Sequence, residues 1–193
     1  MPITNKIERE GISILVWRIT ETLEELKVLS GYINTNNYRS EKREKEHLIT
    51  RLMVNKTCKN ETIIYNEFGA PELDNGKHLS ISHSKELVTI IISDIKSAID
   101  IEKISEKALR IASKFISERN LIQLNKEKAT LIWCIKEAIY KWHQKGGIDF
   151  IKDIIITEFF AKKHGKVTAY FREKKINLNY LKINNHYLVY VCK

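Results

Sequence analysis

Three strand-like apolar runs lie close together in the centre of the chain. They are LSIS (Leu79–Ser82), LVTIIIS (Leu87–Ser93) and SAIDIE (Ser97–Glu102). Helical patterns precede these runs and a further block of helices and strands follows them, an order that is typical of an α+β fold. With 193 residues and 43% hydrophobic content, the chain can bury a sizeable core as one compact unit.

In the first half, a strand is predicted from Gly11 to Ile19, followed by a short helix capped by Thr20 or Thr22 and an amphipathic helix from about Ser40 to Asn55. In the second half, Ser105 opens a helix to about Phe115. Another helix runs from about Glu127 to Gln144 and is predicted to end at Gly146-Gly147. Strands are predicted over the ranges Ile154–Phe160, Val167–Phe171 and Tyr187–Cys192.

The charge balance limits the partners. Lys+Arg 33 minus Asp+Glu 24 gives a net charge of +9, which favours an anionic partner such as nucleic acid, an acidic protein surface or a phosphate-rich small molecule. The three cysteines are far apart and form no CxxC pair, which argues against a disulfide framework or a structural zinc site. No apolar run approaches the length of a membrane span and no signal peptide is evident, so we expect a cytoplasmic protein.

Asp100 and Glu102 lie two residues apart on a predicted strand, so both carboxylates point to the same face. Such a pair is common at a solvated strand end, and a metal site is the alternative. In the helix that follows, Trp133, Glu137 and Lys141 repeat every four residues on one stripe, away from the apolar one. Glu137 and Lys141 also form an ordinary helix-stabilising pair. Three carboxylates without a histidine cluster would suit Mg²⁺.

The earlier helix carries a basic stripe of Arg43, His47 and Arg51 at four-residue spacing. Arginine offers a planar fork of donors to phosphate oxygens, whereas a solvated face with pairs such as Lys42 and Glu46 is the alternative interpretation. No Walker, dinucleotide-binding, kinase or G-x-S-x-G pattern is present, so the ordinary nucleotide-binding and hydrolase folds have no support.

In order and spacing, several segments resemble the signature of the 4′-phosphopantetheinyl transferase superfamily. They are LSISHS (Leu79–Ser84), AIDIE (Ala98–Glu102), KFISE (Lys114–Glu118) and WCIKEAIYK (Trp133–Lys141). The segment KREKEHLITRLM, Lys42–Met53, resembles the basic helix of the larger, monomeric members. The resemblance covers roughly residues 38 to 172.

The resemblance implies an α+β fold of two similar halves packed as a pseudo-twofold dimer, with coenzyme A between them. We expect residues 1–95 to form the first half and 96–193 the second, as one compact monomer. The implied reaction transfers 4′-phosphopantetheine from coenzyme A to a serine of an acidic acyl or peptidyl carrier protein of fatty-acid or secondary-metabolite synthesis. It releases 3′,5′-ADP and needs Mg²⁺.

By motif position, the resemblance also implies site residues. Asp100, Glu102 and Glu137 would hold Mg²⁺ against the pyrophosphate, and Lys141 would neutralise the same phosphates. Glu137 or Glu118 would deprotonate the serine. The residues implied to bind coenzyme A are Arg43, Arg51, Ser82, His83, Lys136 and Lys141.

The chain departs from the family pattern at several positions. Gly69-Ala70-Pro71 stands where many members have Gly-Lys-Pro, so one phosphate-facing lysine is missing. Asn120 stands where some members place a base. These departures keep open a second interpretation, a coenzyme A-binding or carrier-binding module without turnover. A nucleic-acid-binding domain, the third, rests on charge alone, because no nucleic-acid-binding motif is present; we therefore expect neither nucleic acid nor a membrane as partner.

Overall fold

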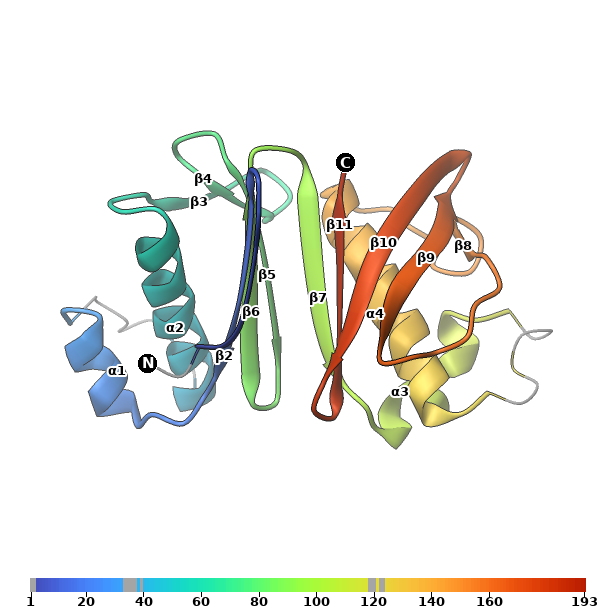
Figure 1. Ribbon diagram of the computed structural model, residues 1–193, viewed down its shortest axis with the longest axis horizontal. Helices are drawn as coiled ribbons and strands as arrows, with labels where there is room; N and C mark the ends of the chain where they lie inside the picture. The colour runs from blue at the N-terminus through green and yellow to red at the C-terminus, as the bar shows by residue number, and fades with distance from the viewer. Residues whose placement is uncertain (1–2, 33–37, 39, 118–120, 122–123) are drawn as a thin grey trace.

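The computed structural model describes residues 3–32, 38, 40–117, 121 and 124–193, and shows four layers along the long axis of the molecule (Figure 1). Helix α2, with α1 packed against it, covers the outer face of one sheet, and α4, with α3 packed against it, covers the outer face of the other. The two sheets face each other in the centre. This is the α+β arrangement of two similar halves that the sequence predicts.

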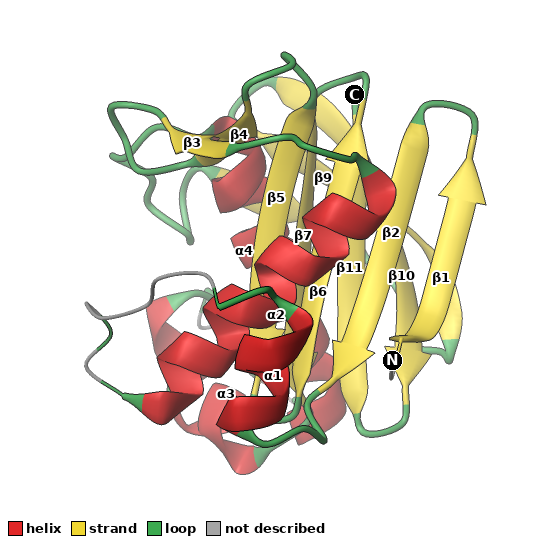
Figure 2. Ribbon diagram, turned by 90° about the vertical axis from the view of Figure 1, so that its left-hand side faces the viewer, coloured by secondary structure: helices red, strands yellow, loops and turns green. Residues whose placement is uncertain are grey.

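The first sheet has six strands in the order β1-β2-β6-β5-β4-β3, and every neighbouring pair is antiparallel. Figure 2 shows this sheet with α1 and α2 in front of it. Its elements are β1 (Ile3–Arg9), β2 (Ile12–Arg18), α1 (Leu23–Leu29), α2 (Glu41–Thr57), β3 (Ile63–Tyr65), β4 (Pro71–Leu73), β5 (His78–Ser84) and β6 (Leu87–Ser93).

The second sheet has five antiparallel strands in the order β7-β11-β10-β9-β8. Strand β7 is therefore an outer strand, and it lies next to β5 of the other sheet. The elements of this half are β7 (Ser97–Lys103), α3 (Glu106–Arg110), the 3₁₀ helix η1 (Ala112–Lys114), α4 (Lys126–His143), β8 (Ile154–Ile156), β9 (His164–Phe171), β10 (Lys174–Ile183) and β11 (His186–Cys192).

Apolar side chains fill each interface between layers. Leu48, Ile49 and Met53 of α2 pack on the first sheet, and Leu131 and Ile135 of α4 pack on the second. A third cluster lies between the sheets and joins the two halves into one core; it includes Ile14, Val16, Ile91, Ile99, Ile101 and Leu188. Among the described residues, no helix is both long and apolar enough to cross a membrane.

Local signals set several element ends. Thr22 caps α1 with a capping box to Glu25, and Ser40 accepts a hydrogen bond from the Arg43 amide at the start of α2. At the turn between β1 and β2, Gly11 has φ +66, and a Cβ there would lie 2.9 Å from Asp94 Oδ2. A side chain at this position would therefore be strained.

Several predicted boundaries were wrong. The helix expected from Ser105 to Phe115 is split into α3 and η1, and the strand from Ile154 ends at Ile156. Helix α4 ends at His143, close to the predicted end at about Gln144, but its cap is Gln144 itself, in the left-handed conformation (φ 63), and not the glycine pair that follows. Strands β1 and β10 were not predicted, although Ile176, Leu178 and Tyr180 alternate along β10 and are buried.

Candidate active site

Helix α4 lies across β7 and brings its polar stripe to the two strand carboxylates. Lys141 Nζ donates to Asp100 Oδ1 at 2.7 Å, and Trp133 Nε1 donates to Glu102 Oε1 at 3.1 Å. The stripe predicted from sequence thus faces the D-x-E strand. The alternation of β7 and the four-residue spacing on α4 together explain this arrangement.

Asp100 is 3% exposed and is held from both halves of the molecule. Its Oδ1 accepts from Lys141 of α4 and from Ser82 Oγ of β5, the latter at 2.7 Å. Within the described part of the chain, its Oδ2 is buried without a hydrogen-bond partner. A buried carboxylate oxygen without a donor is costly, and a cation would satisfy it.

The other two carboxylates share this environment. Burial, together with the neighbouring Asp100 carboxylate, raises the pKa of Glu137 to about 7. Burial and Asp100 also raise the pKa of Glu102, although the hydrogen bond from Trp133 acts to lower it. Mutual repulsion of this kind is typical of carboxylates that share a metal or catalytic site.

This donor set fits Mg²⁺, which prefers carboxylate oxygens and retains waters or phosphate oxygens as its other ligands. Among the described residues, no three His, Cys, Asp or Glu side chains converge as a ready-made metal cage. The hydrogen bonds account for this, because the Asp100 carboxylate is bonded to Ser82 and Lys141, whereas the Glu102 carboxylate is bonded to Trp133. The fit therefore rests on the unpartnered Asp100 Oδ2 and on the donor chemistry.

A second polar group lies on the first half, where α2 meets the end of β5. Arg43 Nη1 donates to His83 Nε2 at 2.9 Å, and His83 Nδ1 lies 3.5 Å from Glu46 Oε1. Burial lowers the pKa of His83, although Glu46 opposes the shift, so the neutral ring can accept the arginine donor. Two turns after Arg43, Arg51 has a buried Nε without a hydrogen-bond partner among the described residues.

Glu46 is a residue whose importance the sequence did not reveal. The expected Lys42–Glu46 pair is present at 3.5 Å, yet Glu46 is only 4% exposed and also pairs with Arg43 at 3.4 Å. The face is therefore a partly buried ion-pair network. The spacing of Glu46, three residues after Arg43, was the available signal for their ion pair. The second partner, His83, comes from a strand that is distant in sequence.

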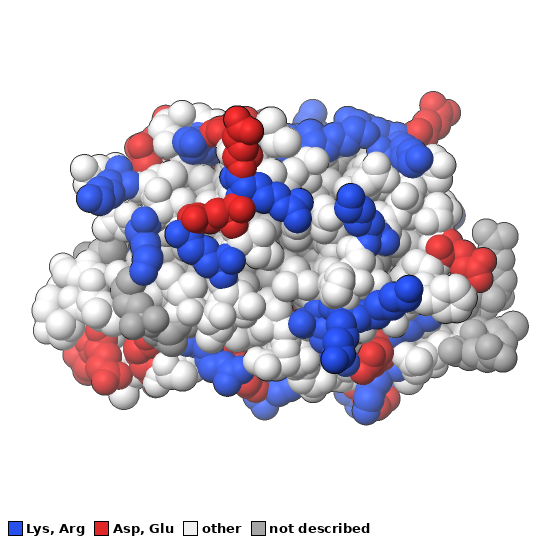
Figure 3. Space-filling model, viewed as in Figure 1, with Lys and Arg blue, Asp and Glu red and all other residues white. Residues whose placement is uncertain are grey.

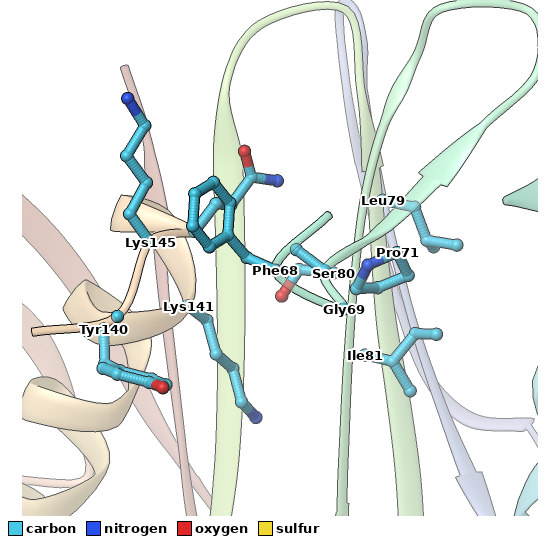
Figure 4. A pocket seen from close by; sticks show the side chains of 12 residues that line it. Phe68, Gly69, Pro71, Leu79, Ser80, Ile81, Tyr140, Lys141 and Lys145 are labelled. Carbon is cyan, nitrogen blue, oxygen red and sulfur yellow. The ribbon is translucent and has the colours of Figure 1, made fainter. Parts of the chain in front are cut away.

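A cavity of about 240 Å³ lies between the halves (Figure 4). One wall is the loop Phe68–Pro71 with Leu79–Ile81 of β5, and the other is the end of α4, including Tyr140 and Lys141. Lys141 thus borders both this cavity and the carboxylate group. The cavity opens beside Lys141, a side chain of the type that binds phosphate. The aromatic rings of Phe68 and Tyr140 in its walls are exposed.

Comparison with known proteins identifies the family. The sequence model of the 4′-phosphopantetheinyl transferase superfamily matches residues 97–192. The chain is also 31% identical, over 189 residues, to the 4′-phosphopantetheinyl transferase gsp of Aneurinibacillus migulanus, an alignment covering 90% of this chain and 74% of that protein. This chain belongs to the 4′-phosphopantetheinyl transferase superfamily. It is accordingly an enzyme of this transferase class, whose members use coenzyme A as a substrate.

One expected site residue of the transferase does not join these groups. Lys136 is buried on another side of α4, where its Nζ donates to the carbonyl oxygens of Phe150 and Ile154. It borders a separate cavity of about 620 Å³. Burial lowers its pKa to about 8, against the opposing effect of Asp149. Glu118, the other expected base, and Asn120 lie outside the described residues.

Ser82, which the resemblance places against coenzyme A, lies on β5 beside His83. Its hydroxyl accepts from the Ile101 amide at 3.2 Å and donates its one proton to Asp100. The structure brings together Asp100, Glu102, Glu137 and Lys141 around α4 and β7. It brings Arg43 and His83 together at the end of β5, with Arg51 further along α2.

Proposed function

We propose that this protein transfers the 4′-phosphopantetheine group from coenzyme A to a serine hydroxyl of an apo carrier protein. In this step the serine oxygen bonds to the phosphorus that bears the pantetheine arm. The bridging P–O bond breaks, 3′,5′-ADP leaves, and the serine loses its proton. The observation that carries the proposal is the buried Asp100, whose Oδ2 lacks a donor beside Glu137 and Lys141.

The two polar groups suit the two ends of the nucleotide part of coenzyme A. Arg43 and Arg51 would bind the 3′-phosphate, because arginine N–H groups are strong phosphate donors, and His83 would hold Arg43 in position. Supporting this, Arg51 Nε has no partner within the described residues. The cavity between Phe68 and Tyr140 would take the adenosine, and Lys141 would lie against the pyrophosphate.

Asp100, Glu102 and Glu137 would hold Mg²⁺ beside that pyrophosphate. The ion would offset the charge that repels an incoming oxygen nucleophile and would stabilise the leaving phosphate. Glu137 is also the described carboxylate best suited to accept the serine proton, directly or through a water. Without a metal ion, burial and the Asp100 carboxylate raise its pKa to about 7, and a bound Mg²⁺ would lower this pKa.

The carrier protein would approach a positively charged molecule. The net charge of +9 favours steering of the acidic helical surface usual in carrier proteins. On the face shown in Figure 3, Lys and Arg are spread over both halves with acidic groups between them. We propose that the protein works as a monomer, since both halves of the cleft belong to one chain. We propose the cytoplasm as its location.

Intact-mass spectrometry tests this function. Apo acyl and peptidyl carrier proteins are incubated with the protein and coenzyme A, with Mg²⁺ or with EDTA. We expect a gain of one phosphopantetheine group on at least one carrier, in the presence of Mg²⁺ only. Binding of coenzyme A without any gain would favour the module without turnover, which the absence of a lysine at Ala70 suggests.

A further inference from the structure

Strand β7 is the outer strand of its sheet, and the amides along its free edge have unusual partners. The amides of Ile99, Ile101 and Lys103 donate to serine hydroxyls of β5, at 3.2, 3.2 and 3.0 Å. The three acceptors are Ser80, Ser82 and Ser84. Outer-strand amides need partners when they are buried, and here side chains supply them across the boundary between two sheets.

The three serines, here called the serine ladder, share one face of β5 because they alternate along the strand. They are 5%, 5% and 8% exposed. Strands β5 and β7 come from different halves and face each other across the centre of the molecule (Figure 1). A slip of one residue between them would break every rung and a slip of two would break one, so the observed register is the one that keeps all three bonds.

The middle rung has an additional bond. Ser82 Oγ accepts from the Ile101 amide and donates its own proton to Asp100 Oδ1 at 2.7 Å. With Lys141 on the same oxygen, Oδ1 is held by two donors. This leaves Oδ2, which has no partner within the described residues, as the oxygen available to a cation.

We infer that the serine ladder fixes the register of the two halves and that Ser82 is a positioning residue, which orients Asp100 so that Oδ2 is free for the metal. The second part rests on the proposed function, because it takes Asp100 as a metal ligand. The first part does not. In this role Ser82 acts through Asp100, whereas the sequence predicted that it contacts coenzyme A.

Three matched variants test the inference: Ser82→Ala, with Ser80→Ala and Ser84→Ala as controls that each remove one rung. Each should speed hydrogen exchange at its own amide, of Ile101, Ile99 and Lys103 respectively. Ser80→Ala and Ser84→Ala should each lower the melting temperature by about 2–4 °C, the loss of one buried hydrogen bond, and Ser82→Ala, which loses two, should lower it further. Ser82→Ala, but not its metal-binding control Ser84→Ala, should weaken Mn²⁺ binding in the presence of coenzyme A by about tenfold, the equivalent of one hydrogen bond to a charged group.

Coenzyme A binding without metal separates the two roles of Ser82. A positioning residue leaves that affinity unchanged in Ser82→Ala; a weakened affinity would mean direct contact and would overturn the inference. Equal Mn²⁺ affinity in Ser82→Ala and Ser84→Ala would also overturn it. If Ser82→Ala does not fold, Ser82→Thr keeps the hydroxyl and should retain both Ile101 protection and Mn²⁺ affinity; loss of either in the folded variant would contradict the role of the hydroxyl.

The two proposals fail in different ways. If the wild-type protein neither binds Mn²⁺ nor modifies a carrier, the proposed function is wrong, and the metal role of Ser82 is wrong with it. The exchange rates of the three amides still decide the register of the serine ladder. Unchanged exchange in all three variants would refute the ladder even in an active enzyme.

Discussion

Helices α2 and α4 occupy equivalent places in the two halves but contribute different chemistry to the candidate site. They have 17 and 18 residues, and each packs an apolar stripe on its own sheet. Helix α2 contributes the cations Arg43 and Arg51 with the buried Glu46, whereas α4 contributes Glu137 and Lys141 beside the carboxylates of β7. The fold is thus nearly symmetric, while the polar groups that it positions are not.

This difference indicates a division of work. Cations on α2 can bind a phosphate group that does not react, and such binding stabilises ground state and transition state alike. Carboxylates on α4 and β7 can hold a metal where charge changes during the reaction, which acts on the transition state. The first half should therefore govern the KM for coenzyme A, and the second half should govern kcat.

The largest expected effect comes from Glu137→Gln on α4. Loss of this carboxylate removes a metal ligand or base worth several kcal/mol, so we expect kcat to fall about 10³-fold. The KM for coenzyme A should change little. Steady-state kinetics on a carrier protein, with Asp100→Ala as a second variant, measures the effect.

Glu106→Gln is the matched control for that prediction. Glu106 lies on α3 and pairs with Lys126 at the surface. The substitution therefore removes the same charge from the same half without changing the site. It should retain full activity. Full activity in Glu137→Gln or Asp100→Ala would remove the assignment of the carboxylates.

The sequence predicted the α4 side of this comparison well. The four-residue spacing of Trp133, Glu137 and Lys141 is a local property of a helix, and so is the alternation of Asp100 and Glu102 on a strand. Both could be read without knowing the fold. The contacts of Ser82 and Glu46 could not, because their partners, Ile101 and His83, come from strands that only the packing of the whole chain brings near.

Element ends were harder to predict for related reasons. The glycines after α4 favoured an end at Gly146, but Gln144 adopts the left-handed conformation first, with its amide donating to Tyr140 O at 3.3 Å. Strand β10 was missed because lysines and asparagines on its outer face interrupt the apolar pattern. Its inner residues still alternate, and that period of two was the available signal.

The second prediction concerns the far side of α4, where Lys136 holds the segment from Phe150 to Ile154. Lys136→Met leaves two buried carbonyls without their donor, so the free energy of unfolding should fall by about 2 kcal/mol. This side of α4 is structural, so kcat should be unaffected in the folded variant. Urea unfolding at pH 7 and the kinetic assay measure the two quantities.

The same variant carries a pH dependence. Lys136 has a folded-state pKa of about 8, below the ordinary value of 10.5, because of burial. Between these pH values the unfolded state binds the proton more tightly, so the wild-type protein gains stability as pH rises from about 8 to 10.5 and loses it as pH falls. The stability difference from Lys136→Met should widen over this range. A constant difference over this range would contradict the lowered pKa.

The third prediction tests the α2 side. Arg51→Ala should raise the KM for coenzyme A about tenfold with kcat nearly unchanged, the loss of one charged hydrogen bond to a non-reacting phosphate. With dephospho-coenzyme A, which lacks the 3′-phosphate, the variant and the wild-type protein should have the same KM. Lys56→Ala, on the last turn of α2, is the control and should match the wild type. A tenfold effect that persists with dephospho-coenzyme A would place Arg51 elsewhere on the substrate.

The smallest effect is expected at Ala70, where the family resemblance implies a lysine that the first half lacks. Ala70 lies on the cavity wall beside Gly69 and Pro71, and across the cavity from Lys141. Ala70→Lys should tighten coenzyme A binding about threefold at low salt, since an exposed ion pair contributes only about 0.2–1 kcal/mol, and the gain should vanish at high salt. Ala70→Met adds length without charge and should not reproduce it. If Ala70→Lys changes kcat instead of affinity, the first half takes part in the reaction itself, and the division between α2 and α4 does not hold.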